Sequence, residues 1–169
     1  MIQNRREAAM KWAAIISLVI FAGCLATGTP TRDTLVDRDS VQMHAQIAYA
    51  LMTLDDNPDI QNSIYTPSVS RLEEIGEPAL DPLLPYLLSN NSVTREHAGT
   101  AIGLIVMKMY GFVRSQGWSS PEGEGEFHKQ YQKLWGDTKV SLSPRDRSPE
   151  ECSRFIENTK LWLASRRTN

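Results

Sequence analysis

Histidine, cysteine and carboxylate side chains do most of the metal and acid–base chemistry of proteins. This chain has three histidines, His44, His97 and His128, and each falls in a different predicted helix. None has the spacing of a zinc-binding motif, and no glycine-rich phosphate loop or G-x-S-x-G turn occurs. We therefore expect a protein that is not an enzyme and has no cofactor. The alternative is a small enzyme that uses His97 with the neighbouring Glu96.

Two acidic stretches resemble cation-binding loops in part. From Asp55 to Thr66, oxygen-bearing side chains alternate as in a calcium loop, but Ile60 stands where such a loop needs glycine and Thr66 where it needs glutamate. The glutamates of PEGEGE, residues 121–126, are separated by glycine, which is typical of a solvated loop. We expect no metal site in either stretch.

The two cysteines have different surroundings. Cys24 follows Ala22 and Gly23 at the end of an apolar run. Cys152 falls among apolar positions of a predicted helix, where a thiol usually packs as a small hydrophobic group. Cys24 is therefore the cysteine whose surroundings point to chemistry.

The first residues have the pattern of a signal peptide. Basic residues Arg5, Arg6 and Lys11 precede the apolar run 13–22, which Gly23 ends. Crossing a bilayer takes roughly 20 apolar residues, and this run is about half that length. A removable signal is therefore favoured over a membrane-spanning helix, and a short uncleaved anchor is the alternative.

The residues Phe21, Ala22, Gly23 and Cys24 resemble the lipobox of bacterial lipoproteins. The resemblance implies that a peptidase recognises the three residues before the cysteine, cuts after Gly23, and leaves a diacylglycerol on the Cys24 sulfur. Phe21 departs from the usual leucine. Leu25 is not the aspartate that commonly retains lipoproteins in the inner membrane. A lipid anchor in the cell envelope is implied, with the periplasmic face of the outer membrane favoured.

The composition predicts one globular domain behind this anchor. The chain has 169 residues, 41% of them hydrophobic, and a formal net charge of −2, which gives no basic excess for binding nucleic acid. We divide the chain into a signal peptide (1–23), a flexible tether (24–39) rich in Thr, Gly and Asp, and a helical domain (40–169).

Apolar residues at helical spacing predict an all-α domain without strands. The predicted helices are 41–54, 66–75, 78–88, 93–113, 127–135 and 149–167. Pro82 and Pro85 should kink or shorten the third helix. Ser148 and Glu151 form a capping box that predicts the start of the last one.

The segment from Leu72 to Ile105 resembles a HEAT repeat. The resemblance lies in a Gly-x-Pro corner, a leucine-rich helix, a polar turn and a second helix with small residues; its positions are Ile75, Gly76, Pro78, Ala79, Leu80, Leu83, Leu84, Leu88, Arg95, Ala98, Ala101, Ile102 and Gly103. Asn91 and Thr94 depart from the usual residues. A short stack of about three helix pairs is implied; an unrelated six-helix bundle is the alternative.

Together these patterns predict a lipid-anchored protein whose helices bind a protein partner or act as a scaffold. A purely structural envelope protein is a further alternative. Trp118, which falls in a predicted loop, is the candidate contact residue because an exposed tryptophan often anchors an interface.

Overall fold

The computed structural model describes residues 32–56, 64–136, 144 and 147–168. The predicted signal peptide, Cys24 and the first part of the predicted tether lie outside these residues. The chain divides into two units, residues 1–39 and Ser40–Asn169. The second unit contains the helical domain.

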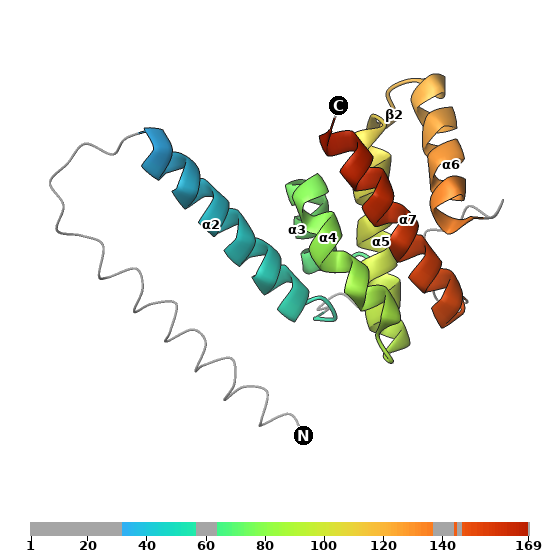
Figure 1. Cartoon of the computed structure of the whole chain (residues 1–169), viewed down its shortest axis with the longest axis horizontal. Helices are drawn as coiled ribbons and strands as arrows, with labels where there is room; N and C mark the ends of the chain where they lie inside the picture. Colours follow the sequence, from blue (N-terminus) through green and yellow to red (C-terminus); the bar gives the residue numbers. More distant parts are fainter. Residues whose placement is uncertain (1–31, 57–63, 137–143, 145–146, 169) are drawn as a thin grey trace, which may run out of the picture. The chain divides into compact units, whose positions relative to one another are not determined.

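The described chain is almost entirely helical, as the sequence predicts (Figure 1). The elements, with η for short 3-10 helices, are α2 (Arg32–Met52), α3 (Pro67–Ile75), η1 (Glu77–Ala79), α4 (Leu80–Leu83), η2 (Leu84–Leu88), α5 (Ser92–Met109), β1 (Phe112–Val113), β2 (Gly117–Trp118), α6 (Pro121–Trp135) and α7 (Pro149–Arg167). The exception to the helical prediction is a small hairpin, in which β1 pairs with β2 in antiparallel fashion.

Side-chain caps begin four of these helices. Thr66, Asn91, Ser120 and Ser148 each accept a hydrogen bond from a backbone N–H of the first turn of α3, α5, α6 and α7, respectively. The predicted capping box is confirmed, since the Glu151 side chain also accepts from the Ser148 backbone. These bonds are local, which is why short sequence signals locate these helices.

The proline-rich helix is broken, as its sequence predicts. Pro82 and Pro85 lack backbone donors, and the leucine-rich stretch consists of η1, α4 and η2 in place of one continuous helix. Its leucines still reach the core, where Leu80, Leu83 and Leu87 are fully buried.

Helix α2 starts well before the predicted residue 41. It begins at Arg32, so residues 32–39 of the predicted tether are helical. Ser40, just before the predicted start, lies within the helix, where its carbonyl accepts a 2.7 Å hydrogen bond from His44 Nδ1. Between residues 31 and 52 the chain has no glycine or proline, so no residue strongly disfavours a helix there.

The sequence prediction was also wrong between residues 110 and 126. Helix α5 ends at Met109 because Gly111 turns the chain at φ 89°, and Phe112 and Val113 form β1. The PEGEGE stretch is the start of α6 and not a loop. Ser120 caps this helix and Pro121 occupies its first turn, two local signals that outweigh the low helix propensity of the glycines.

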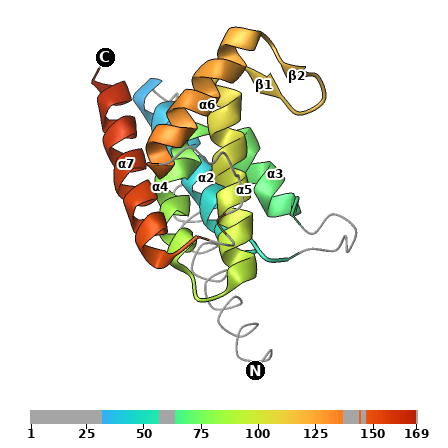
Figure 2. The same cartoon turned by 90° about the vertical axis from the view of Figure 1, so that its right-hand side faces the viewer.

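Helix α5 lies at the centre of the domain. It contacts α3, the η1–α4–η2 stretch and α6, while α7 packs against α6 and η2 (Figures 1 and 2). The middle of α5 is buried, including Gly99 and Gly103.

Candidate functional site

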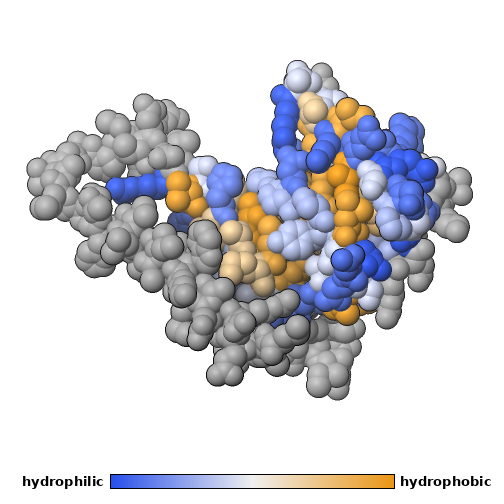
Figure 3. All heavy atoms as spheres, turned by 60° about the horizontal axis from the view of Figure 1, so that its bottom comes forward, coloured by the Kyte–Doolittle hydropathy of each residue, from blue (hydrophilic) through white to orange (hydrophobic). Residues whose placement is uncertain are grey.

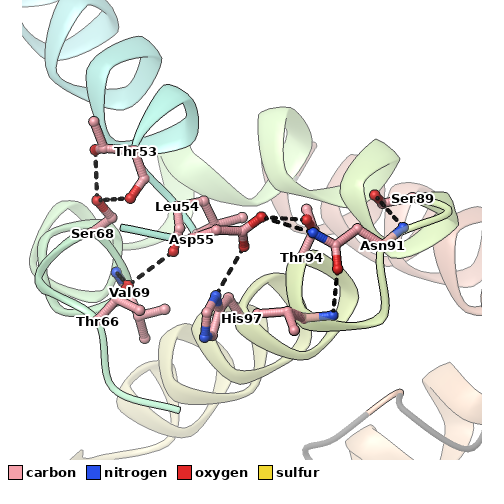
Figure 4. Close-up of polar contacts among 11 residues, drawn as sticks. Thr53, Leu54, Asp55, Thr66, Ser68, Val69, Ser89, Asn91, Thr94 and His97 are labelled. Atoms are coloured by element: carbon pink, nitrogen blue, oxygen red, sulfur yellow. Dashed lines mark hydrogen bonds and ion pairs between the residues drawn. The ribbon is translucent and has the colours of Figure 1, made fainter. Parts of the chain in front are cut away.

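The predicted site residues divide between the described and the other parts of the chain. Phe21, Ala22, Gly23 and Cys24 lie outside the described residues. His97, Glu96 and Trp118 are described, and they lie in different surroundings. His97 belongs to a cluster of polar side chains at one end of the domain (Figure 4).

Asp55 holds this cluster together. His97 Nδ1 donates a 3.0 Å hydrogen bond to Asp55 Oδ1, and the other carboxylate oxygen accepts from Thr94 Oγ1 and, at 3.4 Å, from Asn91 Nδ2 (Figure 4). Asp55 follows α2, whereas Thr94 and His97 lie one turn apart on α5. One carboxylate therefore connects the end of α2 to the start of α5.

A second group of bonds connects α2 to the start of α3. Ser68 Oγ donates to the Thr53 carbonyl at 3.0 Å and lies 2.8 Å from Thr53 Oγ1. Thr66 Oγ1 donates to the Leu54 carbonyl at 3.1 Å and accepts from the Val69 N–H at 3.1 Å (Figure 4). We call the residues 53–55, 66–69, 91, 94 and 97 the α2–α5 junction.

The geometry gives His97 a structural role. In a catalytic dyad the carboxylate orients a histidine whose other nitrogen reaches the substrate. Only 3% of the His97 side chain is exposed, against 38% of the Asp55 side chain. Four hollows on the described surface have linings that include neither residue. Glu96, next to His97 in the chain, is half-buried. The His97–Asp55 pair joins the end of α2 to α5 and leaves little of His97 accessible to a substrate.

The sequence did not identify Asp55 as the partner of His97. Asp55 was considered only as the first residue of a stretch that partly resembles a calcium loop. His97 lies 42 residues further along the chain. Among the described residues, no three His, Cys, Asp or Glu side chains gather closely enough to hold a metal ion. The calcium-like residues 57–63 lie outside the described part.

Trp118 lies in β2 and is half-buried, so the expected exposed loop residue is found packed in the fold. Its ring centroid lies 5.1 Å from that of Phe112 and 5.3 Å from that of Phe127. The hairpin turns Trp118 onto α6 because β1 and β2 place it opposite Phe112. Because Trp118 is only partly exposed, it offers a partner less surface than the predicted loop residue would.

Cys152 is buried in the core, as the sequence predicts. Burial in apolar surroundings raises the pKa of its thiol, which disfavours the reactive thiolate. The nearby Arg147 lies over the Trp135 ring, 4.5 Å from its centroid, and pairs with Glu151 at 3.1 Å. The Cys152 region therefore serves packing.

A hollow of about 460 Å³ between the end of α3 and the hairpin contains charged groups that bind one another. Lys108 Nζ donates to the Glu73 and Glu74 carbonyls, each at 3.2 Å, and Arg114 pairs with the Glu73 carboxylate. The charged groups of Lys108, Arg114 and Glu73, which line this hollow, are therefore already paired with other groups of the protein.

Comparisons with known proteins found no match to this chain. No family model, no curated protein and no solved structure matches it. In the described part of the chain, no helix has the length and apolar character needed to cross a bilayer.

Proposed function

We propose that this protein is a lipoprotein of the bacterial envelope, anchored to a membrane by lipid on Cys24. The observation that carries the proposal is the order of features at the start of the chain: basic residues, an apolar run, and Phe21-Ala22-Gly23-Cys24. Leu25 after the cysteine favours the periplasmic face of the outer membrane over the inner membrane. The anchor supplies location, because the two acyl chains of a diacylglycerol hold a protein at a bilayer without a spanning helix.

The helical domain is suited to binding another protein. It has its own hydrophobic core from Ile47 to Leu163, so it needs no partner to bury its interior. Several large apolar side chains nevertheless remain exposed together on α2, namely Val41, Tyr49 and Met52. Apolar surface of this kind on a protein held at a membrane supports a role as an interaction or scaffold module.

We further propose that the segment from Leu72 to Ile105 is a HEAT-like unit. Gly76 and Pro78 lie at a corner, η1–α4–η2 supply the first helix, and α5 supplies the second. Arg95 donates to the Ser89 carbonyl at 2.8 Å, so it braces the turn through a backbone oxygen in place of an aspartate. In the last pair α7 packs beside η2 and α6 beside α5, an order that differs from plain repetition of the unit.

Mass spectrometry of the mature N-terminus tests the anchor. We expect a chain that begins at Cys24 and carries acyl groups, and a Cys24→Ser variant that keeps residues 1–23 and takes up no labelled fatty acid. Cys152→Ser is the matched control, because it removes the other cysteine and should leave labelling unchanged. An unmodified Cys24 in the wild-type protein would refute the proposal.

The interaction role is tested separately. The intact protein, solubilised from membranes with its acyl chains, should retain a specific partner or a second copy through purification. Trp118→Ala is included in this test because Trp118 is partly exposed. A protein that is a monomer with no partner under these conditions would count against the interaction role and leave the anchor unaffected.

A further inference from the structure

Helix α2 is apolar on two opposite sides. One side faces the core through Ile47, Ala50 and Leu54, with Met43 and Leu51 partly buried beside them. The opposite side carries an apolar stripe that no described element covers, formed by Val41, Ala45, Ala48, Tyr49 and Met52. Val41, Tyr49 and Met52 are 62%, 70% and 67% exposed, respectively.

The spacing of the stripe is that of a helix–helix contact. Val41, Ala45, Ala48 and Met52 follow one another at intervals of four, three and four residues, which keeps them on one face of an α-helix. The two alanines at the centre are small enough to let a second helix approach closely. Figure 3 shows one face of the molecule, on which apolar surface reaches the solvent between hydrophilic patches.

The stripe is also symmetric about its own midpoint. If a second α2 runs antiparallel to the first, Val41 of each copy lies opposite Met52 of the other, and Ala45 lies opposite Ala48. A contact of this kind is isologous, meaning that the same surface serves both copies, as a two-fold dimer requires.

Charges at the two ends of the stripe fit the same arrangement. Arg38 is exposed one turn before Val41, and Asp56 is exposed just beyond the end of α2. Antiparallel pairing brings Arg38 of one copy near Asp56 of the second copy at both ends of the contact. Parallel pairing would instead bring Arg38 next to Arg38, and like charges repel.

The stripe fits another helix better than a membrane surface. From Ser40 to Met52 the helix has no Lys or Arg. Helices that lie on bilayers are usually rich in these residues, which attract anionic headgroups.

We propose that the α2 stripe is the interface of an antiparallel homodimer. The proposal rests on the interaction role proposed for the helical domain and is independent of the lipid on Cys24. It identifies a second copy of this chain as a partner.

Light scattering during size-exclusion chromatography of the full chain in detergent measures the protein mass of the particle, and so the number of copies in it. One copy has a mass of 19.0 kDa before processing, and we expect a protein mass of twice one processed copy. Val41→Glu should raise the dimer dissociation constant by about tenfold or more, because it places unpaired charges in the contact. Leu161→Glu on α7 is the matched control at 65% exposure, and it should change the constant by less than about twofold.

A charge exchange tests the antiparallel orientation. Arg38→Glu should weaken the dimer, and adding Asp56→Arg should restore it, since the two charges would then attract again with reversed signs. A double variant that dimerises no more tightly than Arg38→Glu alone would refute the antiparallel contact.

The remaining outcomes separate this proposal from others. A monomer at every concentration, or a dimer that Val41→Glu leaves intact, overturns it. A wild-type monomer whose binding to anionic phospholipid vesicles falls with Val41→Glu would assign the stripe to a membrane surface. Mass spectrometry of Cys24 in the same samples reports the lipid anchor separately, so failure of one proposal does not affect the other.

Discussion

Two parts of the domain hold their helices together by different means. The α2–α5 junction uses hydrogen bonds to a few polar side chains around Asp55, over a core of aliphatic residues. The α6–α7 pair uses an aromatic cluster, formed by Phe127, Tyr131, Trp135 and Phe155. In the junction each polar atom discussed has a partner, whereas in the aromatic cluster Tyr131 Oη and Trp135 Nε1 have none among the described residues.

The difference shows which changes each part tolerates. The junction depends on direction, because a hydrogen bond is lost when either partner is removed. The aromatic cluster depends on filled volume, because a large buried ring that is removed leaves a cavity. The predictions below test this contrast by denaturant unfolding, from the largest expected effect to the smallest.

Trp135→Ala should give the largest loss. The ring is 1% exposed, its centroid lies 4.2 Å from that of Phe155, and Arg147 covers one face. Removing it should lower the free energy of unfolding by about 3–5 kcal/mol. Trp118→Ala, at a half-buried ring, should cost less than half as much, and equal losses would contradict the assignment of Trp135 to the centre of the cluster.

Asp55→Ala should lower the free energy of unfolding by about 1–3 kcal/mol, because it leaves buried His97 and neighbouring Thr94 without their acceptor. Glu157→Ala on α7 is the control, since this carboxylate is exposed and its loss should change stability by less than about 0.5 kcal/mol. Combining Asp55→Ala with His97→Ala should cost less than the sum of the two single changes. Additive losses would show that the pair does not interact.

Two glycines of α6 should respond with opposite signs. At Gly123 a Cβ would collide with the Tyr110 backbone carbonyl, so Gly123→Ala should destabilise the protein by about 1–3 kcal/mol. At Gly125 a Cβ meets nothing within 4 Å, so Gly125→Ala should stabilise it by about 0.5–1 kcal/mol through helix propensity. Effects of the same sign at both positions would contradict the close contact between Tyr110 and α6.

Tyr131→Phe should have the smallest effect at neutral pH, within about 1 kcal/mol, because the buried hydroxyl that it removes has no well-formed hydrogen bond to the described residues. Burial raises the pKa of Tyr131 from 10.0 to about 12. The folded state therefore keeps this proton as pH rises above 10, while the unfolded state loses it, so the wild-type chain loses stability between pH 10 and 12. The variant should lose less over the measurable part of that range, and parallel pH profiles would refute the raised pKa.

The helix starts could be predicted from the sequence because their signals are local. The Thr66 cap and the Ser148–Glu151 box each act within one turn, and α3 and α7 begin within one residue of the predicted starts. The same kind of signal at Ser120-Pro121 was present but was outweighed in the sequence interpretation by the glycines of PEGEGE. The end of α5 was predicted too late because Phe112 and Val113 continue its apolar pattern while belonging to a strand.

The contacts of the candidate site could not be predicted in the same way. His97 and Asp55 are 42 residues apart, and neither residue carries a local sign of the other. Trp118 falls in an apparent loop, and only the pairing of β1 with β2 turns it onto Phe127. These contacts depend on how whole helices pack.

By itself, the sequence determined the helical class of the domain, the capping box that begins its last helix, and the short motif on which the proposed lipid anchor depends. Each of these depends on neighbouring residues, whose bonds form within one or two turns of chain. The tertiary structure alone decided that His97 holds α2 to α5, that Gly123 meets the Tyr110 carbonyl, and that one side of α2 remains uncovered. Those features join residues far apart in the chain, and only the packing of the core brings such residues together.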